Sequence, residues 1–193
     1  MDRSRNDGAE DGSRHDGRGW GGNYNPQAQP ITIDQATDNV RRYIGSYGGN
    51  LVLTEVMDFA QNFYAEVAEK DSGIHAMELL VDKYTGRIYP EPGPNMMWNS
   101  KYGMMGSMMG RWYSQATPTM SVSAAQAQTI AQQYLDANLS GLTADKAETF
   151  YGYYTLHTLK DGRIEGMLSV NGYTGAVWYH TWHGQFVDMK EFD

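Results

Sequence analysis

The sequence predicts an α+β protein of two repeated units, each with one helix packed on a small antiparallel meander sheet of about three strands. Three observations lead to this prediction. A helical pattern that begins at Thr32 recurs 91 residues later, at Ser123. The triplet YTG at residues 84–86 recurs 89 residues later, at residues 173–175. In both copies the apolar spacing changes from a helical period to a period of two. The difference between the two offsets indicates one short loop deletion.

Each copy is expected to begin with an amphipathic helix. The segment ITIDQATDNVRRYIG contains Thr32-x-x-Gln35, and VSAAQAQTIAQQYLD contains Ser123-x-x-Gln126. At this spacing the hydroxyl and the amide can bond the free backbone N–H groups of a helix start, which makes a capping box. Apolar residues follow at helical spacing in both segments, so each helix should bury one face.

Strands are expected after each helix. The segment NFYAEVAE alternates apolar and polar residues, and the turn KDSG joins it to IHAMELLVD. In the second copy TFYGYYTLHTLK turns at Asp161-Gly162 into RIEGMLSV, and NGYTG then leads into AVWYHTW. Asp-Gly and Asn-Gly pairs between β-rich runs favour hairpins. The glycine of each Thr-Gly pair suits a turn that needs a positive φ.

The order of these signals resembles the PepSY domain. The resemblance rests on ITIDQA with LLVDKYTGRIY in the first copy and on VSAAQA with LSVNGYTGAVW in the second, over roughly residues 31–92 and 120–183. It implies tandem PepSY-like domains, of the type found in propeptides of thermolysin-like metallopeptidases and in cell-envelope and secreted proteins. Such domains are usually viewed as non-catalytic binding or inhibitory modules outside the cytoplasm, so no catalytic residue is transferred.

The chain is expected to contain four segments. Residues 1–28 are rich in Gly, Asp, Arg and Asn, which is typical of a disordered tail. The first repeat covers residues 29–92, a Met/Gly/aromatic linker covers 93–118, and the second repeat covers 119–193. The first residues lack the apolar core of a signal peptide. Either the protein is cytosolic or the sequence begins after a removed leader, and the resemblance favours an extracytoplasmic location in the periplasm, cell envelope or medium.

Composition argues against several classes of function. A formal charge of −8 is unsuited to a nucleic-acid partner, because phosphate binding needs a basic face. No run of 18 apolar residues is present, so we expect no transmembrane segment. The absence of cysteine excludes disulfides, thiolate zinc sites and a cysteine nucleophile. No H-E-x-x-H, G-x-S-x-G or phosphate-binding glycine loop occurs, so we expect no enzymatic activity.

The segment NMMWNSKYGMMGSMMGRWY, residues 95–113, contains six of the twelve methionines. One interpretation is inter-domain packing or a partner surface, because Met adapts to irregular apolar contacts and a large exposed apolar patch normally marks an interaction site. Trp98 and Trp112 should then be largely buried, and Gly103, Gly106 and Gly110 should form bends in the chain. The residues expected to bind a protein or peptide partner, or a second copy of the chain, are Met97, Trp98, Met104, Met108 and Trp112.

A soft-metal site is the alternative interpretation, because neutral thioethers suit Cu(I) better than they suit hard cations. The candidate ligands are Met96, Met97, Met104, Met105, Met108, Met109, His180 and His183. His180 and His183 are three residues apart, so the chain must bend before both can hold one ion. The methionines follow the last strand of the first copy and the histidines follow that of the second. Equivalent ends of two repeats can approach across a pseudo-dyad, which would allow a joint His/Met site.

The sequence therefore predicts a non-catalytic extracytoplasmic module that binds a protein or peptide and has no cofactor. The alternative is a copper-binding or copper-sensing protein.

Overall fold

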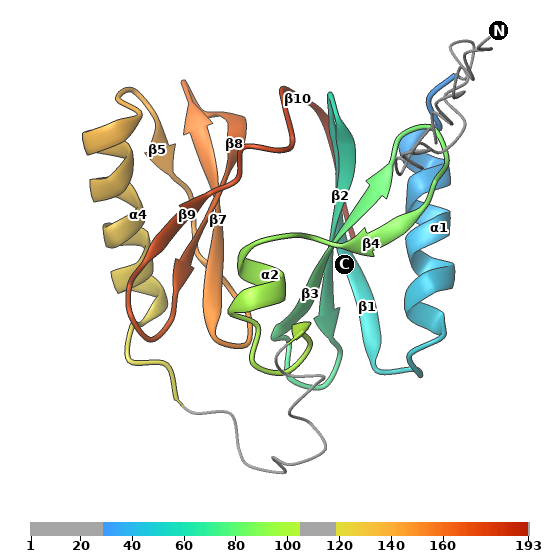
Figure 1. The fold of residues 1–193 in the computed structure, drawn as a ribbon, viewed down its shortest axis with the longest axis horizontal. Helices are drawn as coiled ribbons and strands as arrows, with labels where there is room; N and C mark the ends of the chain where they lie inside the picture. Colours follow the sequence, from blue (N-terminus) through green and yellow to red (C-terminus); the bar gives the residue numbers. More distant parts are fainter. Residues whose placement is uncertain (1–28, 105–118, 193) are drawn as a thin grey trace, which may run out of the picture.

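The computed structural model describes residues 29–104 and 119–192. Two sheets lie back to back, and a helix covers the outer face of each, which gives four layers (Figure 1). This arrangement confirms the α+β class. In the described ranges no helix is both long and apolar enough to cross a membrane.

The first sheet has the strand order β10-β1-β2-β3-β4, and every neighbouring pair is antiparallel. Its strands are β1 (Leu51–Phe59), β2 (Asn62–Glu69), β3 (His75–Asp82), β4 (Ile88–Pro90) and β10 (Phe186–Glu191). Helix α1 (Ile33–Gly45) covers its outer face, and the short helix α2 (Pro94–Met97) follows β4.

The second sheet has the order β5-β7-β8-β9, with β6 also paired to β7. Its strands are β5 (Thr143–Ala144), β6 (Glu148–Thr149), β7 (Tyr153–Lys160), β8 (Arg163–Asn171) and β9 (Val177–Tyr179). Helix α4 (Ala124–Asn138) covers its outer face.

Both predicted capping boxes are present. The Gln35 backbone N–H donates to Thr32 Oγ1 over 3.2 Å, and the Thr32 N–H donates to Gln35 Oε1 over 2.9 Å. Ser123 and Gln126 repeat the exchange over 3.3 and 2.8 Å. Each box satisfies two backbone donors that no helical carbonyl can reach, so both helices begin where the sequence predicts.

The two Thr-Gly turns are also the same. Asp82 Oδ1 accepts the backbone N–H groups of residues 84 and 85, and Asn171 Oδ1 accepts those of residues 173 and 174. Gly86 and Gly175 follow with φ of 66° and 72°, a conformation that glycine adopts without strain. The tandem repeat is therefore confirmed.

The strand registers place the predicted loop deletion. Tyr64 pairs with Leu80 in the first copy, and Thr155 pairs with Ser169 in the second. Equivalent residues in the first strand of the pair are therefore 91 positions apart between the two copies, and those in the second strand are 89 positions apart. The two-residue deletion falls in the hairpin that joins them.

The sheets are larger than the expected three strands. The period-two pattern did not single out β1, although it lies next to β2 in the first sheet. Strand β10 lies within residues 119–193, yet it pairs with β1 rather than with the second sheet. This crossing segment joins the two halves of the molecule covalently and by backbone hydrogen bonds.

Apolar side chains pack in three clusters. One lies between α1 and the first sheet and one between α4 and the second. The third lies between the sheets and contains Met57, Phe59, Tyr64, Leu80 and Met167. The space between the sheets is only partly apolar, because many buried polar side chains share it.

The turn acceptors offer a matched test of the repeat. Asp82→Ala removes the acceptor of two backbone N–H groups and of the Thr85 hydroxyl, so we expect a loss of about 1–2 kcal/mol in unfolding free energy. Asn171→Ala should cost about 1 kcal/mol for the same reason. Urea denaturation measures both. No change in either variant would mean that the turns do not stabilise the repeats.

Candidate metal centre

Five glutamate side chains are buried among the described residues. One of them, Glu69 at the end of β2, forms an ion pair with Lys101, and the other four lie in or beside the layer between the sheets. Glu55, Glu66 and Glu78 come from β1, β2 and β3, and Glu91 follows β4 directly. Each is 6% exposed or less. Removing an ionised carboxylate from water costs several kcal/mol unless hydrogen bonds or an opposite charge compensate it. The partners of these carboxylates therefore decide what the layer can do.

Glu78 is held by three hydroxyl groups. Tyr64 and Thr155 donate to its Oε1 over 2.9 and 2.8 Å, and Tyr153 donates to its Oε2 over 2.7 Å. Burial and the negative charge of Glu91 raise the pKa of Glu78 well above its usual value. Donors from both sheets thus satisfy this carboxyl group without a cation.

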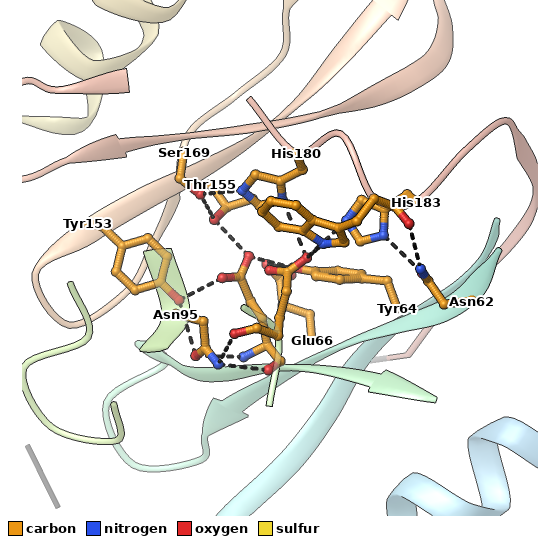
Figure 2. A network of polar contacts seen from close by, with 12 residues as sticks. Asn62, Tyr64, Glu66, Asn95, Tyr153, Thr155, Ser169, His180 and His183 are labelled. Atoms are coloured by element: carbon orange, nitrogen blue, oxygen red, sulfur yellow. Dashed lines mark hydrogen bonds and ion pairs between the residues drawn. The ribbon is translucent and has the colours of Figure 1, made fainter. Parts of the chain in front are cut away.

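Glu91 instead faces two histidines from the second repeat. His183 Nε2 lies 2.9 Å and His180 Nδ1 lies 3.4 Å from Glu91 Oε1. Trp182 Nε1–H donates to the same oxygen over 3.1 Å, and its ring stacks on His180. Glu91, His180 and His183 are 0, 3 and 1% exposed. Figure 2 shows both imidazoles turned toward the first sheet.

The hydrogen bond to Asn62 assigns the tautomer of His183. Asn62 Nδ2–H donates to the Trp182 carbonyl over 3.0 Å, so its Oδ1 is the atom that faces His183 Nδ1, at 2.9 Å. His183 Nδ1 must therefore be the donor. In the neutral imidazole Nε2 then has a lone pair, and this lone pair is on the side of Glu91.

A chain of hydroxyl groups assigns the tautomer of His180. With Glu78 Oε1 as the acceptor of the Thr155 hydroxyl, Thr155 accepts in turn from Ser169 Oγ, which is 2.9 Å away. Ser169 has one hydroxyl proton, so it accepts from His180 Nε2–H over 3.0 Å. Neutral His180 then has its lone pair on Nδ1, again toward Glu91. Figure 2 follows this chain from Thr155 through Ser169 to His180.

Glu91 and the two histidines consequently each have one buried acceptor atom without a donor, and the Glu91 oxygen nearest the imidazoles, Oε1, accepts only from Trp182 among the described residues. Glu91 Oε2, His180 Nδ1 and His183 Nε2 have no hydrogen-bond partner in the described chain; the 2.9 Å contact of His183 lacks hydrogen-bond geometry. One ligand atom from each residue lies within 4.8 Å of the others. Unpaired buried acceptors are costly, whereas a bound cation would satisfy all three. Two imidazoles and a carboxylate are a common set of transition-metal ligands.

The pKa shifts of Glu91 and His183 also favour a bound cation. Burial opposes ionisation of Glu91, but positive charge at His180 and His183 outweighs it and lowers the pKa of Glu91 to about 2. Burial also lowers the pKa of His183 below its usual value, which removes part of that positive charge at neutral pH. The lowered pKa of Glu91 requires positive charge beside it, whereas the lowered pKa of His183 removes positive charge. The two shifts therefore conflict if the imidazoles are the only cations. Complete burial of the His183 ring accounts directly for its lowered pKa.

The structure brings together two of the predicted metal ligands, His180 and His183. The required bend is present, because β9 ends at Tyr179 and an irregular turn carries both imidazoles. The methionines lie differently. Met97 and Met104 are 60 and 54% exposed, and Met96 is partly buried. Met105, Met108 and Met109 lie outside the described residues. The joint His/Met site therefore stays a prediction, and the described methionines do not accompany the histidines into the interior.

The predicted partner surface is described only in part. Trp98 is partly buried and packs edge-on against Trp178, with ring centroids 5.9 Å apart. Gly103 is a tight bend, because a Cβ there would lie 2.5 Å from the Asn99 carbonyl oxygen. Met108 and Trp112, with Gly106 and Gly110, lie outside the described residues.

Sequence reasoning missed Glu91, although a signal for it was present. At the offset of 89 the aligned segments LLVDKYTGRIYPE and LSVNGYTGAVWYH end at Glu91 and His180. The expected approach of equivalent repeat ends thus occurs, with a carboxylate and an imidazole at the two equivalent positions. The sequence also gave no indication that Asn62 and Ser169 would orient the imidazoles, because these contacts depend on sheet packing.

A second histidine cluster lies in the same layer. His75 is 3.2 Å from Glu66 and 3.3 Å from Glu148 of the second sheet. His157 is 3.4 Å from Glu55. Burial opposes the charge on His75, but the two carboxylates outweigh it and raise its pKa to about 10. This imidazolium therefore joins the two sheets by ion pairs.

Comparisons with known proteins add little to this geometry. No protein-family model matches the chain, and no curated protein matches it. Among solved structures, the C-terminal domain of YpeB from Bacillus megaterium is similar, with 10% identity over 77% of this chain and a TM-score of 0.27. The match spans 62% of that structure's length. A TM-score this low does not establish a shared fold, so the PepSY resemblance continues to rest on the sequence.

The His75 cluster predicts how stability depends on pH. A folded-state pKa of about 10 against an ordinary value of 6.5 means that the imidazolium stabilises the fold fully below pH 6.5. This contribution is lost as the pH rises toward 10. Glu66, whose pKa burial raises, acts with the same sign. At acid pH the reverse applies to Glu148, whose contribution is lost as the pH falls from 4.5 toward its lowered pKa of about 2.

We therefore expect the unfolding free energy, measured in EDTA, to fall between pH 6.5 and 10 in the wild type. The fall should be shallower in His75→Gln. Equal slopes in the two proteins would show that His75 is not charged in the folded state.

Proposed function

We propose that the protein is a non-catalytic module that binds one divalent transition-metal ion between its two repeats. The ligands are the Glu91 carboxylate, His180 Nδ1 and His183 Nε2. The observation that supports this proposal is that all three residues are buried, each has an acceptor atom without a donor, and one possible ligand atom from each lies within 4.8 Å of the others. A cation would replace three unsatisfied acceptors with three coordinate bonds.

The ligand chemistry favours Zn²⁺ or a similar first-row ion. Nitrogen and carboxylate oxygen suit borderline ions such as Zn²⁺, Cu²⁺ and Ni²⁺, whereas Ca²⁺ and Mg²⁺ prefer all-oxygen sites. Tetrahedral zinc with bonds of about 2.0–2.2 Å holds its ligand atoms roughly 3.3–3.6 Å apart. The 2.9 and 3.4 Å separations from Glu91 Oε1 need little adjustment to reach this spacing.

The surrounding groups are those that metal sites commonly use. A metal-bound imidazole usually donates its other N–H to a neighbouring acceptor, which fixes the ring. Asn62 and Ser169 accept these N–H groups here. Trp182 donates to the Glu91 carboxylate. Because Glu91 comes from the first repeat and the histidines from the second, a bound ion would hold the two repeats together.

We expect the chelator-treated wild type to bind one equivalent of Zn²⁺ in calorimetric titration. At a free concentration of 100 Kd, Zn²⁺ should stabilise the fold by about 2.7 kcal/mol. Glu91→Gln and His183→Gln should each weaken binding by about 100-fold or more, because each removes one of three ligands. Co²⁺ loaded into the wild type should show the visible absorption of nitrogen and oxygen ligation.

A matched control separates this site from a thioether site. The triple variant with Met96, Met97 and Met104 changed to Leu should bind Zn²⁺ as the wild type does. Loss of affinity in this variant, or Cu(I) binding that survives Glu91→Gln, would favour the methionine site. Absence of Zn²⁺, Ni²⁺ and Cu²⁺ binding by the folded wild type would refute the proposal and leave a protonated Glu–His cluster.

Recognition of a protein or peptide outside the cytoplasm is a second candidate function. It is favoured by the exposure of Met97 at 60% and of Trp178 at 37%, beside the partly buried Trp98. A second copy of the chain is the simplest partner to test. We expect Met97→Ser with Trp178→Ser to reduce self-association in analytical ultracentrifugation without lowering the melting temperature. A wild type that stays monomeric at high concentration would remove this partner.

A further inference from the structure

The segment that carries both histidines continues directly into strand β10. His183 is three residues before Phe186, where β10 begins. The Gln61 N–H donates to the His183 carbonyl over 3.1 Å, and the Ala60 N–H donates to the Gln185 carbonyl over 2.8 Å. The start of β10 is therefore positioned by the same turn that presents the metal ligands.

The side chains of strand β10 interact only weakly with the rest of the sheet. None of its six side chains is buried. Its register places Glu191 opposite Glu55 and Asp188 opposite Asp58, and like charges directly opposite each other destabilise a strand pair. Asp58 has Lys83 as a compensating partner, but Glu55 Oε1 has only a 3.4 Å contact with His157 and no hydrogen bond.

Backbone pairing with β1 holds β10, and side-chain contacts add to it mostly at the ends of the strand, with Met189 packed against the cluster between the sheets. Phe186 packs edge-on against Phe59 at the start of the strand. Lys190 pairs with Asp34 at the helix, and Arg41 lies over the Phe192 ring, 4.7 Å from its centroid. The Lys190–Asp34 ion pair is on the surface, where it contributes little. The turn before Phe186 adds to this pairing, because it positions the start of the strand through its hydrogen bonds to residues 60 and 61.

We infer that the metal ion controls strand β10. With the ion bound, residues 180–185 are fixed and β10 stays paired with β1. Without it, the three acceptors repel one another, the turn loosens and β10 leaves the sheet. The exposed β1 edge then binds an extended peptide strand by backbone hydrogen bonds. This inference rests on the metal site proposed above.

The chemistry of the β1 edge specifies the incoming strand. A Lys or Arg opposite Glu55 would replace the acidic Glu191 and donate to the unsatisfied Glu55 Oε1. Apolar residues at the positions of Phe186 and Met189 would retain the contact with the cluster between the sheets. The fitting partner is thus an extended segment with apolar residues at these two positions and a basic residue at the position of Glu191.

Hydrogen exchange of the full chain tests the control by metal. The amides of residues 186–191 should exchange about tenfold faster in EDTA than with saturating Zn²⁺, whereas those of β7 and β8 change little. Glu191→Lys should slow β10 exchange in EDTA by about fivefold, with Glu191→Gln in between, because a like-charge pair becomes an ion pair. If Zn²⁺ binds calorimetrically but β10 exchange is unchanged, the metal site stands and this inference fails.

A peptide tests the opened edge. The peptide of residues 185–192 with Glu191→Lys should bind the metal-free protein at least fivefold more tightly than the unsubstituted peptide does, and saturating Zn²⁺ should weaken this binding. Fluorescence anisotropy of the labelled peptide measures both effects. Equal affinity of the two peptides, or binding that Zn²⁺ does not alter, would overturn the proposed strand docking. Formation of a dimer in EDTA without peptide would instead mean that a second copy's β10 occupies the edge.

Discussion

The burial of carboxylates between two sheets is the constraint on which this structure depends. A sheet interface made only of apolar residues would need no further explanation, but here four glutamates lie in or beside it. Each must be satisfied by hydrogen bonds or by an opposite charge, because an uncompensated buried charge would outweigh the gain from packing. Glu78 receives hydroxyl groups, Glu66 receives His75, and Glu91 receives two imidazoles. The way the repeats face each other is therefore set by polar matching as much as by hydrophobic burial.

Much of each repeat could be predicted because its signals are local. Capping at Thr32 and Ser123 and the turns at Asp82 and Asn171 involve residues within three positions of one another, so the sequence contains the whole interaction. Strand β10 could not be found in this way. Its residues, FVDMKE, have no buried face, and its partner strand is more than a hundred residues away in the chain. Tertiary pairing, not local propensity, makes it a strand.

The candidate site shows the same division between local and long-range information. His180 and His183 were identifiable as potential ligands from their residue type. Glu91 was not, because a single glutamate after a short strand is ordinary until the second sheet is placed against it. The methionines are the opposite case, and their role as ligands or partner surface stays a prediction. Their composition is conspicuous, but composition does not say where a side chain lies, and Met97 and Met104 are exposed.

A closer comparison of the repeats explains how two similar units can pack through polar faces. Equivalent positions meet near a pseudo-dyad, so identical residues there would place like charges together. The registers make Glu91 equivalent to His180 and Glu66 equivalent to His157. In both cases an acid in the first repeat corresponds to an imidazole in the second, and each acid lies in the field of its counterpart. The repeats are thus alike where turns and helix caps build each fold, and they differ in charge where the two folds touch. The proposed metal ion at Glu91 would extend this arrangement, because it would supply the positive charge that a neutral imidazole lacks.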